Sequence, residues 1–397
     1  MWFKNSSDQE RQAIFTETLR GPDRALEIRP EQRPAAFIGS QIYRNEAFGS
    51  HHPLSIPRVA GVMDICAMLG WLGDNVFRDS PPATVSQLTQ FHEAHYVQAL
   101  KRADEEGRVE KEVRERYRIG TMENPVFPGL FQRASTAVGG SILAAQLALE
   151  GKVAFHPAGG THHGRPDRAS GFCYFNDPVF SITTLLDAGL DRILYVDLDA
   201  HHGDGVQDAY AEDPRVLTIS IHEEKRWPRT GPVTDRAGGA ARNLPVPSGF
   251  NDSELSHLMN HAVLHLGREF EPQALVITCG TDALQGDPLS GMALSNAGLW
   301  AAVEQLLELC DHNVVLGGGG YNPWTVVRCW SGLWGRLSHR EIPGLLPPDA
   351  QAFLQGLDCD LVDEEDVKQE WTTTLADEPN TGPVREQVKA LVTRVIN

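Results

Sequence analysis

Short apolar runs recur along the middle of the chain, and each is followed by polar or glycine-rich residues. Their length and β-branched content predict buried strands at 152–155, 193–196, 216–221, 274–278 and 314–316. Around them, apolar residues at helical spacing predict helices at 131–149, 178–186, 254–269 and 297–310. This alternation predicts an α/β fold, in which helices cover both faces of a central parallel sheet.

The regions before and after this block have weaker patterns. They predict a strand at 35–43, helices at 58–72 and 91–112, and a last helix at 383–396. The very polar stretch 105–118 is interpreted as a solvated helix face or a surface excursion. We predict one main domain at 35–340, an N-terminal extension at 1–34 with a short helix and a loop, and a C-terminal appendage at 341–397 that packs on the domain.

The composition narrows the functional classes. Of the 397 residues, 41% are hydrophobic, which suffices for a large core, and 53 acidic against 35 basic residues give a net charge of −18. This charge argues against nucleic-acid binding through phosphates and favours cationic ligands. The polar N-terminus predicts no secretory signal, no apolar run reaches the ~20 residues that span a membrane, and the six cysteines form no CxxC pair. We therefore expect a cytoplasmic protein without a thiolate metal site.

Each predicted strand of the central block ends in residues suited to chemistry. The sequences at these ends are HPAGGTHHG, DLDAHHGD, SIHEEKRWP, CGTDALQGD and GGGGYN. Ligands of parallel α/β sheets bind at the carboxyl ends of the strands, so these segments should meet at one edge. The sequence therefore predicts an active site at that edge.

The segment 193–204, ILYVDLDAHHGD, holds the densest group of acids and histidines. Side chains alternate along a strand, so Asp197, Asp199 and His201 point the same way if the chain stays extended. Burying such groups is costly unless a divalent metal ion offsets the cost; a buried Asp–His hydrogen-bond cluster is the alternative. Asp282 follows another strand and would complete a set with Asp199 and His201 that leaves positions open for water and substrate. Zinc suits this set, and the oxygen ligands also permit Fe²⁺ or Co²⁺.

Two further groups suit acid–base chemistry. His162 and His163 stand in a glycine-rich segment, where both can enter one pocket, although a surface loop with two solvated histidines is the alternative. Asp197 and Asp204 are available to orient them. Tyr321 follows four glycines that permit positive φ and local movement, so its hydroxyl can stabilise an oxyanion. Taken alone, that segment is better explained by a glycine loop over a buried tyrosine.

Four segments carry a resemblance to a known family: GGTHHGRPDRASGFCYFND, VDLDAHHGDGVQDAY, CGTDALQGDPL and GGGGYN. In order and approximate spacing they resemble the zinc-dependent histone deacetylases of the arginase/deacetylase superfamily, over residues 35–336. SGFCYFND is more similar to bacterial class I-like members, including acetoin-utilisation deacetylases, than to the polyamine-specific branch. The resemblance implies the arginase/deacetylase fold, a single domain with a parallel sheet of about eight strands flanked by helices.

The resemblance also implies roles for single residues. The family's zinc ligands match Asp199, His201 and Asp282. Its other catalytic side chains match His162, His163, Asp197, Asp204 and Tyr321. The lining of its acyl-lysine tunnel matches Gly171, Phe172, Trp227 and Leu289. His163 would be the main general base and then the general acid, and Arg58 is similar, more weakly, to the arginine of an internal channel through which acetate leaves.

The family also carries a potassium ion beside the zinc. By resemblance, its ligands are Asp197, Asp199, His201, Ser220 and Ile221. A second monovalent site matches backbone carbonyls near Tyr210, Asp213 and Val216. Residue spacing alone indicates neither site.

Arginases share this fold but hold two manganese ions. Gly203 and Leu284 stand here where arginases carry further metal-binding acids, so a single metal ion and amide hydrolysis are preferred. We predict a zinc-dependent hydrolase that removes acetyl or other acyl groups from lysine side chains of proteins or peptides, since Phe172 and Trp227 would form an apolar slot for the lysine stem.

Two other functions stay open. The first is deacetylation of acetylpolyamines or other small amines, in which an acid at the rim reads a distal ammonium; Glu123, Glu223 and Glu224 are the candidates, although solvated surface acids are the preferred interpretation. The second is a catalytically silent scaffold that binds acyl-lysine. No membrane or direct nucleic-acid partner is expected, and the sequence sets no oligomeric state.

Overall fold

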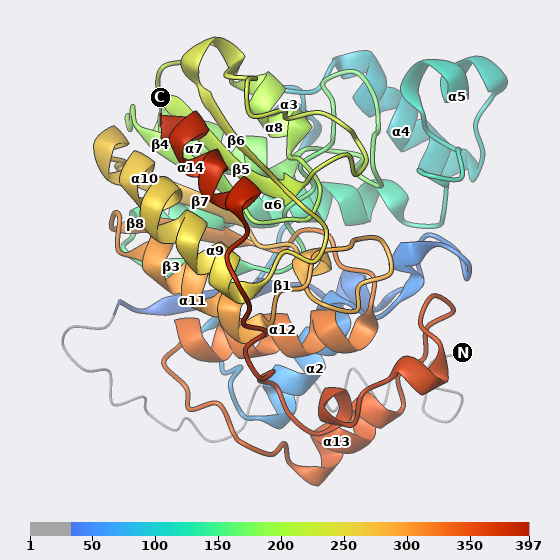
Figure 1. Cartoon of the computed structure of the whole chain (residues 1–397). Helices are drawn as coiled ribbons and strands as arrows, with labels where there is room; N and C mark the ends of the chain where they lie inside the picture. Colours follow the sequence, from blue (N-terminus) through green and yellow to red (C-terminus); the bar gives the residue numbers. More distant parts are fainter. Residues whose placement is uncertain (1–32, 397) are drawn as a thin grey trace.

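The computed structural model describes residues 33–396, so the short helix expected in the N-terminal extension lies outside the described residues. The described chain forms one sheet of eight parallel strands, in the order β2-β1-β3-β8-β7-β4-β5-β6 (Figure 1). The strands are β1 (Ala35–Gly39), β2 (Phe77–Asp79), β3 (Val153–His156), β4 (Ile193–Asp197), β5 (Val216–Glu223), β6 (Ala241–Val246), β7 (Ala274–Thr278) and β8 (His312–Leu316). The predicted α/β fold with a parallel eight-stranded sheet is confirmed.

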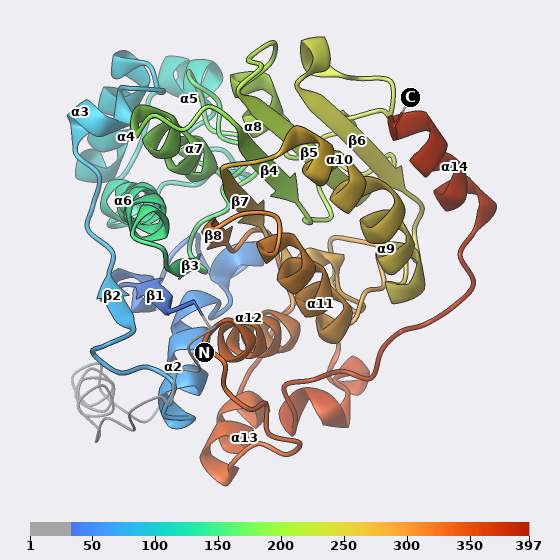
Figure 2. The same ribbon diagram turned by 90° about the vertical axis from the view of Figure 1, so that its left-hand side faces the viewer.

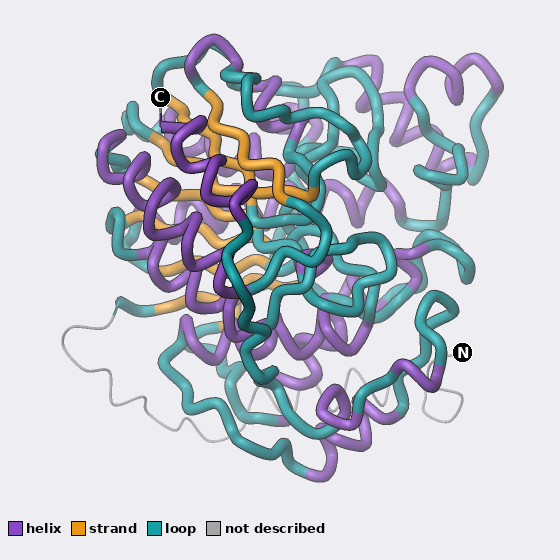
Figure 3. The backbone as a smooth tube through the Cα atoms, in the orientation of Figure 1, coloured by secondary structure: helices purple, strands orange, loops and turns teal. Residues whose placement is uncertain are grey.

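Helices cover both faces of the sheet (Figure 2), and Figure 3 distinguishes the helices, in purple, from the strands, in orange. One face carries α6 (Leu130–Leu149) and α7 (Asp177–Asp187), and the other carries α2 (Val59–Met68), α9 (Asp252–Leu258), α10 (Leu264–Phe270), α11 (Asn296–Leu307) and α12 (Pro323–Leu337). On β4, Ile193 and Tyr195 pack into the first layer, and Leu194 and Val196 into the second. Burial on both faces explains why this strand is continuously apolar.

The remaining helices lie around this core. They are α3 (Val85–Leu88), α4 (Ala94–Glu106), α5 (Lys111–Tyr117), α8 (Asp204–Ala209), α13 (Pro348–Gln355) and α14 (Glu386–Ile396). In the polar stretch 105–118, Gly107 ends α4 at φ 68°, and α5 follows with most of its residues exposed. This confirms the interpretation of that stretch as a solvated helix face. None of the helices in residues 33–396 is long and apolar enough to cross a bilayer.

Some elements differ from the sequence prediction. The first strand ends at Gly39 rather than at residue 43, because Gln41–Arg44 forms a 3-10 turn. The sequence does not predict β2, which has three residues, or β6, whose sequence ARNLPV mixes polar residues and a proline with apolar ones. It also misses α12, because two glycines disfavour a helix there and nearly every face of this helix is buried.

The chain after residue 340 runs back along the main domain to α14, shown in red in Figure 1. Arg328 of α12 is fully buried and pairs with Asp377 of this segment, Nη2 to Oδ1 at 2.7 Å. Arg385 pairs with Glu254 at 2.6 Å, and Trp371 is buried in the main core. The segment therefore contributes charges and apolar surface to the interior.

Candidate active site

The segments expected to meet at one edge of the sheet do so. They follow β3, β4, β5, β7 and β8, and these parallel strands all end at that edge. In the register of the sheet, Asp197 at the end of β4 lies between Ser220 of β5 and Thr278 of β7. The strands thus bring residues more than a hundred positions apart into one site.

Asp199, His201 and Asp282 form a buried cluster whose ligand atoms all lie within 4.8 Å of one another. Nδ1 of His201 is 2.8 Å from Oδ2 of Asp282 and 3.3 Å from Oδ1 of Asp199. The other carboxylate oxygens accept backbone hydrogen bonds, from Gly319 N to Asp199 at 2.6 Å and from Ala200 N to Asp282 at 2.9 Å. These bonds fix both carboxylates, so the cluster could bind a metal ion without rearrangement.

The surroundings of this cluster fit a divalent cation. No lysine or arginine of residues 33–396 pairs with Asp199 or Asp282, so two buried carboxylates lack a full counter-charge. Glycines leave the space around the carboxylates: a Cβ on Gly280 would lie 2.1 Å from Asp199 Oδ2, and one on Gly319 would lie 2.1 Å from Asp282 Oδ2. One imidazole and two carboxylates are a common ligand set for a catalytic metal ion with open positions.

Asp197 does not join this cluster, so the simple expectation of Asp197, Asp199 and His201 on one metal-facing side is wrong. Its Oδ2 lies 2.7 Å from Nδ1 of His162 and accepts a hydrogen bond from the Tyr195 hydroxyl at 2.7 Å, and its Oδ1 accepts one from Asp199 N. The strand ends at Asp197, and the chain no longer alternates as in an extended strand. Asp282, from a different strand, is the third member instead.

His162 and His163 are both buried, with ring centroids 3.9 Å apart. Nδ1 of His162 lies 2.7 Å from Asp197 Oδ2, and Nδ1 of His163 lies 2.8 Å from Asp204 Oδ1. An ionised carboxylate only accepts, so each Nδ1 carries a proton, and on His163 the Nε2 atom is left available for proton exchange. The alternative of two solvated histidines is therefore wrong.

The two histidines have opposite protonation. Burial and the positive charge of His162 lower the pKa of His163 to about 3. Burial also disfavours charge on His162, but Asp197 and Asp199 outweigh it and raise its pKa to about 9. At neutral pH, His163 is neutral and able to accept a proton, while His162 is a fixed cation beside it.

Tyr321 also lies beside the cluster. Its ring is buried, 6.4 Å from the His201 ring and 5.8 Å from the Phe172 ring. Burial and the charges of Asp282 and Asp199 hold the pKa of Tyr321 well above 10, so its hydroxyl stays protonated and can donate. Gly318 and Gly320 have φ of 144° and 141°, a backbone conformation that favours glycine and turns the chain beneath Tyr321.

The predicted tunnel residues surround the same centre. The exposed Trp227 packs its ring 4.6 Å from that of His163, whereas Phe172 lies beside Tyr321. Gly171 lies under Trp227, since a Cβ there would be 2.4 Å from the indole ring. Leu289 is half-buried nearby and its backbone N donates to Asp287. Trp227 beside His163 and Phe172 beside Tyr321 thus both border the residues around the cluster.

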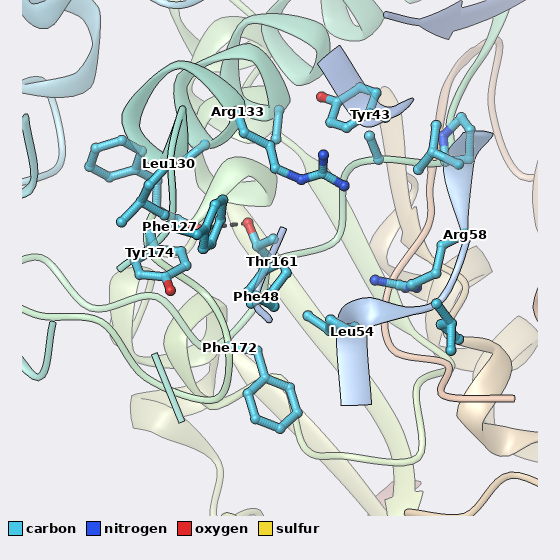
Figure 4. A pocket seen from close by; sticks show the side chains of 17 residues that line it. Tyr43, Phe48, Leu54, Arg58, Phe127, Leu130, Arg133, Thr161, Phe172 and Tyr174 are labelled. Carbon is cyan, nitrogen blue, oxygen red and sulfur yellow. Dashed lines mark hydrogen bonds between the residues drawn. The ribbon is translucent and has the colours of Figure 1, made fainter. Parts of the chain in front are cut away.

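Arg58 lies at the start of α2 and donates from Nη2 to the carbonyl of Gly318, in the glycine loop before Tyr321. Its guanidinium stacks over Trp330 at 5.0 Å. It lines a cavity of about 100 Å³ that Phe172 and Thr161 also line (Figure 4). Arg58, which the sequence matches only weakly to the family's channel arginine, therefore lines an internal cavity next to the active site.

The family follows from comparison with known proteins. The family model for the histone deacetylase domain matches residues 52–337. The chain belongs to the histone deacetylase family. The acetoin utilization protein AcuC of Bacillus subtilis (strain 168) is 32% identical over 333 residues, which cover 80% of this chain and 85% of that protein. Histone deacetylase 8 of Xenopus laevis is 33% identical over 273 residues, 67% of this chain and 83% of that protein.

Solved structures agree. The crystal structure of a histone deacetylase homologue from Aquifex aeolicus matches with a TM-score of 0.87 and 35% identity, covering 91% of this chain and 100% of that one. A structure of a homologue complexed with SAHA has the same values. The fold is the arginase/deacetylase fold, and the protein is a deacetylase of the bacterial class I-like, AcuC-type branch.

The deacetylase site includes residues that the sequence analysis misses. Arg165 donates to the carboxylates of both Asp204 and Asp208, and its charge helps lower the pKa of Asp204 to about 2. Burial alone would raise the pKa of Asp204. The hydrogen bond from His163 lowers it, and by more than the charge of Arg165 does. Arg165 stands two positions after the paired histidines, which is the only signal in the sequence for its role.

Asp287 is the second missed residue. It is buried, and its two oxygens accept hydrogen bonds from Tyr321 N at 2.7 Å and from Leu289 N at 2.9 Å. One carboxylate thus ties the backbone of Tyr321 to that of Leu289. Asp287 stands in the segment CGTDALQGDPL, but the sequence does not indicate this contact.

The three acids considered as rim residues have different surroundings in the structure. Glu223 is buried, so its interpretation as a solvated surface acid is wrong: it pairs with Arg226 through both oxygens, at 2.7 and 2.9 Å. Oε1 of Glu123 accepts a hydrogen bond from Gly171 N at 2.9 Å. Glu224 is exposed, as expected of a surface acid.

The residues matched to monovalent sites are placed as follows. The Ser220 hydroxyl lies 2.8 Å from Nδ1 of His222, next to Asp197 in the sheet register. Ile221 follows it on β5. In the second set, Asp213 N donates to the carbonyl of Tyr210 and Val216 N to that of Asp213, so a tight turn collects these carbonyls.

Proposed function

We propose that this deacetylase removes acyl groups from lysine side chains, with one zinc ion held by Asp199, His201 and Asp282. The observation that carries the proposal is that a neutral, carboxylate-oriented His163 and a protonated Tyr321 both lie beside His201 of the Asp–His–Asp cluster, with ring centroids 6.3 and 6.4 Å from its ring. When bound there, zinc would polarise the amide carbonyl and lower the pKa of the attacking water.

The chain's own residues then perform the proton transfers. Nε2 of His163 takes a proton from the water as it attacks the carbonyl carbon. The Tyr321 hydroxyl donates to the oxygen on which negative charge develops. His163 returns its proton to the leaving amine nitrogen, and the carbon–nitrogen bond breaks. His162 remains cationic on Asp197 and stabilises negative charge without exchanging a proton.

We also propose a potassium ion near Asp197, bound by the carbonyls of Asp199, His201 and Ile221 and by the Ser220 hydroxyl. Adjacency of Asp197 and Ser220 in the sheet supports the site. Oxygen-only ligands suit a hard cation of this kind. The second monovalent site near Tyr210 is proposed on the family pattern and on the turn that collects its carbonyls.

An acyl-lysine of a protein or peptide is the substrate that the site favours. The apolar walls Phe172 and Trp227 suit an alkyl stem. A polyamine would need a free acid near the mouth. Glu223 pairs with Arg226, Glu123 accepts a hydrogen bond from Gly171 N, and the exposed Glu224 lies 3.7 Å from the ammonium of Lys225. A catalytically silent scaffold would not need the buried dyad of His163 and Asp204. The polyamine and scaffold functions are therefore not preferred.

The test compares substrates on the metal-loaded protein. We expect turnover of an acetyl-lysine peptide, about one zinc per chain, and at least about tenfold lower kcat/KM for N-acetylputrescine. Asp282→Ala should lose both zinc and activity while keeping its circular dichroism spectrum. Turnover by a folded, metal-free Asp282→Ala protein would refute the mechanism.

We also propose a cellular location and domain boundaries for the protein. Its six cysteines are all free, which suits the reducing cytoplasm. We retain domain boundaries after residues 34 and 340, with the last segment packed on the catalytic domain.

A further inference from the structure

The cavity beside the active site is lined by two arginines. Arg58 enters it from the start of α2, and Arg133 from the first turn of α6; Figure 4 shows both guanidinium groups pointing into the same space. The rest of the lining is mostly apolar and includes Phe48, Leu54, Ile56, Phe127, Leu130 and Phe175. An apolar space with two cationic groups on its wall suits a ligand that is part hydrocarbon and part anion.

Arg133 has no acidic partner within residues 33–396. Its Nη1 donates to the carbonyl of Ile42 at 3.0 Å, and its guanidinium stacks on Tyr43 at 5.1 Å. No carboxylate in residues 33–396 pairs with it. Burial and the charge of Arg58 lower the pKa of Arg133 to about 10, so it remains charged at neutral pH. An unpaired guanidinium in an apolar surrounding is costly unless an anion joins it.

Arg58 has spare hydrogen-bonding capacity at the end of the cavity nearest the metal-binding cluster. Its Nη2 donates to Gly318, but its buried Nε has no hydrogen-bond partner among the described residues. The next peptide, Gly319 N, donates to Asp199 of the cluster at 2.6 Å. The far end of an acyl group on this cluster would therefore point towards Arg58.

We propose that the space between Arg58 and Arg133 binds a carboxylate, and that the deacetylase accepts acyl chains that end in one, such as succinyl-lysine. This inference rests on the proposed deacylase function. The resemblance links Arg58 to acetate release, but it assigns nothing to Arg133. Hydrolysis is balanced as for acetyl: water adds OH to the acyl carbon, the carbon–nitrogen bond breaks, the amine gains a proton, and free succinate leaves. Two guanidinium groups would bind the terminal carboxylate by charge-assisted hydrogen bonds.

A matched set of acyl peptides tests the proposal. One peptide is prepared with acetyl-, succinyl- or 4-methylpentanoyl-lysine; the last has the shape of succinyl with methyl groups in place of the terminal oxygens. For the zinc-loaded protein, we expect kcat/KM for succinyl to exceed that for 4-methylpentanoyl by about 10–100-fold, the effect of a hydrogen bond to a charged group. Arg133→Met should reduce succinyl turnover at least about tenfold more than acetyl turnover, and Arg133→Lys should reduce it less.

The outcomes separate this inference from the function on which it rests. No turnover of any acyl peptide would refute the proposed function itself. Turnover of acetyl without a preference for succinyl over 4-methylpentanoyl would overturn only the inference, as would equal losses on all three substrates in Arg133→Met. Inhibition of acetyl turnover by free acetate and succinate identifies the source of the carboxylate. If Arg133→Met weakens that inhibition but leaves substrate preference unchanged, the cavity binds released acid, and the acyl-chain assignment is wrong.

Discussion

The carboxylate of Asp204 accepts a hydrogen bond from Nδ1 of His163 at 2.8 Å, and both groups are buried. The same carboxylate accepts from Arg165, so it stays ionised. This pairing fixes the His163 tautomer and leaves Nε2 as the basic atom on the side of the metal-binding cluster. We therefore expect the reactivity of the site to depend on this buried acid, which orients His163.

Asp204→Asn should therefore lower kcat/KM by about 10²–10⁴, the usual contribution of general acid–base catalysis, because an amide can impose the wrong tautomer on His163. Asp208→Asn is the matched control, since Asp208 also accepts from Arg165 but is exposed. We expect the control to lose less than about threefold. Steady-state kinetics on an acetyl-lysine peptide measure both, and equal losses would contradict the role given to Asp204.

Asp287 should act through Tyr321. Tyr321→Phe removes an oxyanion donor and should cost about 10²–10³ in kcat. Asp287→Asn replaces one of the two carboxylate oxygens by an amide nitrogen, which cannot accept, so Tyr321 N or Leu289 N loses its partner and we expect a loss of about tenfold or more. In a double-mutant cycle, Asp287→Asn should have little further effect on kcat in Tyr321→Phe. Full additivity would show that Asp287 has only a structural role.

Gly171→Ala should obstruct the tunnel. A Cβ there would lie 2.4 Å from the Trp227 ring and 2.6 Å from His163 Cδ2, at a φ of 55°. Gly107→Ala is the control, because its φ of 68° gives similar backbone strain with no neighbour within 4 Å. Both variants should lose about 1 kcal/mol of stability, but only Gly171→Ala should lower kcat/KM, by about tenfold or more. Unchanged kinetics in Gly171→Ala would place the substrate path elsewhere.

His92 should make the protein less stable in acid. It is buried, with Nδ1 2.9 Å from the carbonyl of Arg165 and Nε2 accepting from Asn176 N at 3.1 Å. Burial lowers its pKa from 6.5 to about 4. Between pH 6.5 and about 4 the unfolded chain binds a proton that the folded chain does not, so stability falls as pH falls, by up to about 3 kcal/mol in total for this group.

His92→Gln tests this contribution. Its hydrogen bonds are altered, so its stability should be lower throughout. The slope of unfolding free energy against pH, however, should be shallower than that of the wild type by up to about 1.4 kcal/mol per pH unit between pH 6.5 and 4. Urea denaturation at several pH values measures both slopes. Identical slopes would show that His92 does not titrate in this way.

The sequence predicts the sheet and the principal site because both have local signals. β4 and β7 are uninterrupted apolar runs, and the acids of the metal-binding cluster follow them directly. The sequence does not show where side chains meet across the fold. Three contacts depend on loop conformations: the hydrogen bond from Arg165 to Asp204, the one from Tyr321 N to Asp287, and the pairing of buried Glu223 with Arg226.

Short and atypical elements are missed for a different reason. β6 lies at the edge of the sheet, where alternation is relaxed and a proline is tolerated. α12 contains Gly332 and Gly335 and is buried on nearly all sides, so neither helix propensity nor an exposed polar face marks it in the sequence. Arg133 also has no signal, because one arginine in an alanine-rich helix gives no indication that it faces a cavity.

The ion pair between Arg328 and Asp377 also bears on how the protein is synthesised. While Asp377 is still inside the ribosome, the guanidinium of Arg328 has no carboxylate partner, and burying it alone would be strongly unfavourable. We therefore expect α12 to dock fully only after translation has passed residue 377. A nascent chain stalled before that point should remain sensitive to protease even though every predicted catalytic residue has already emerged.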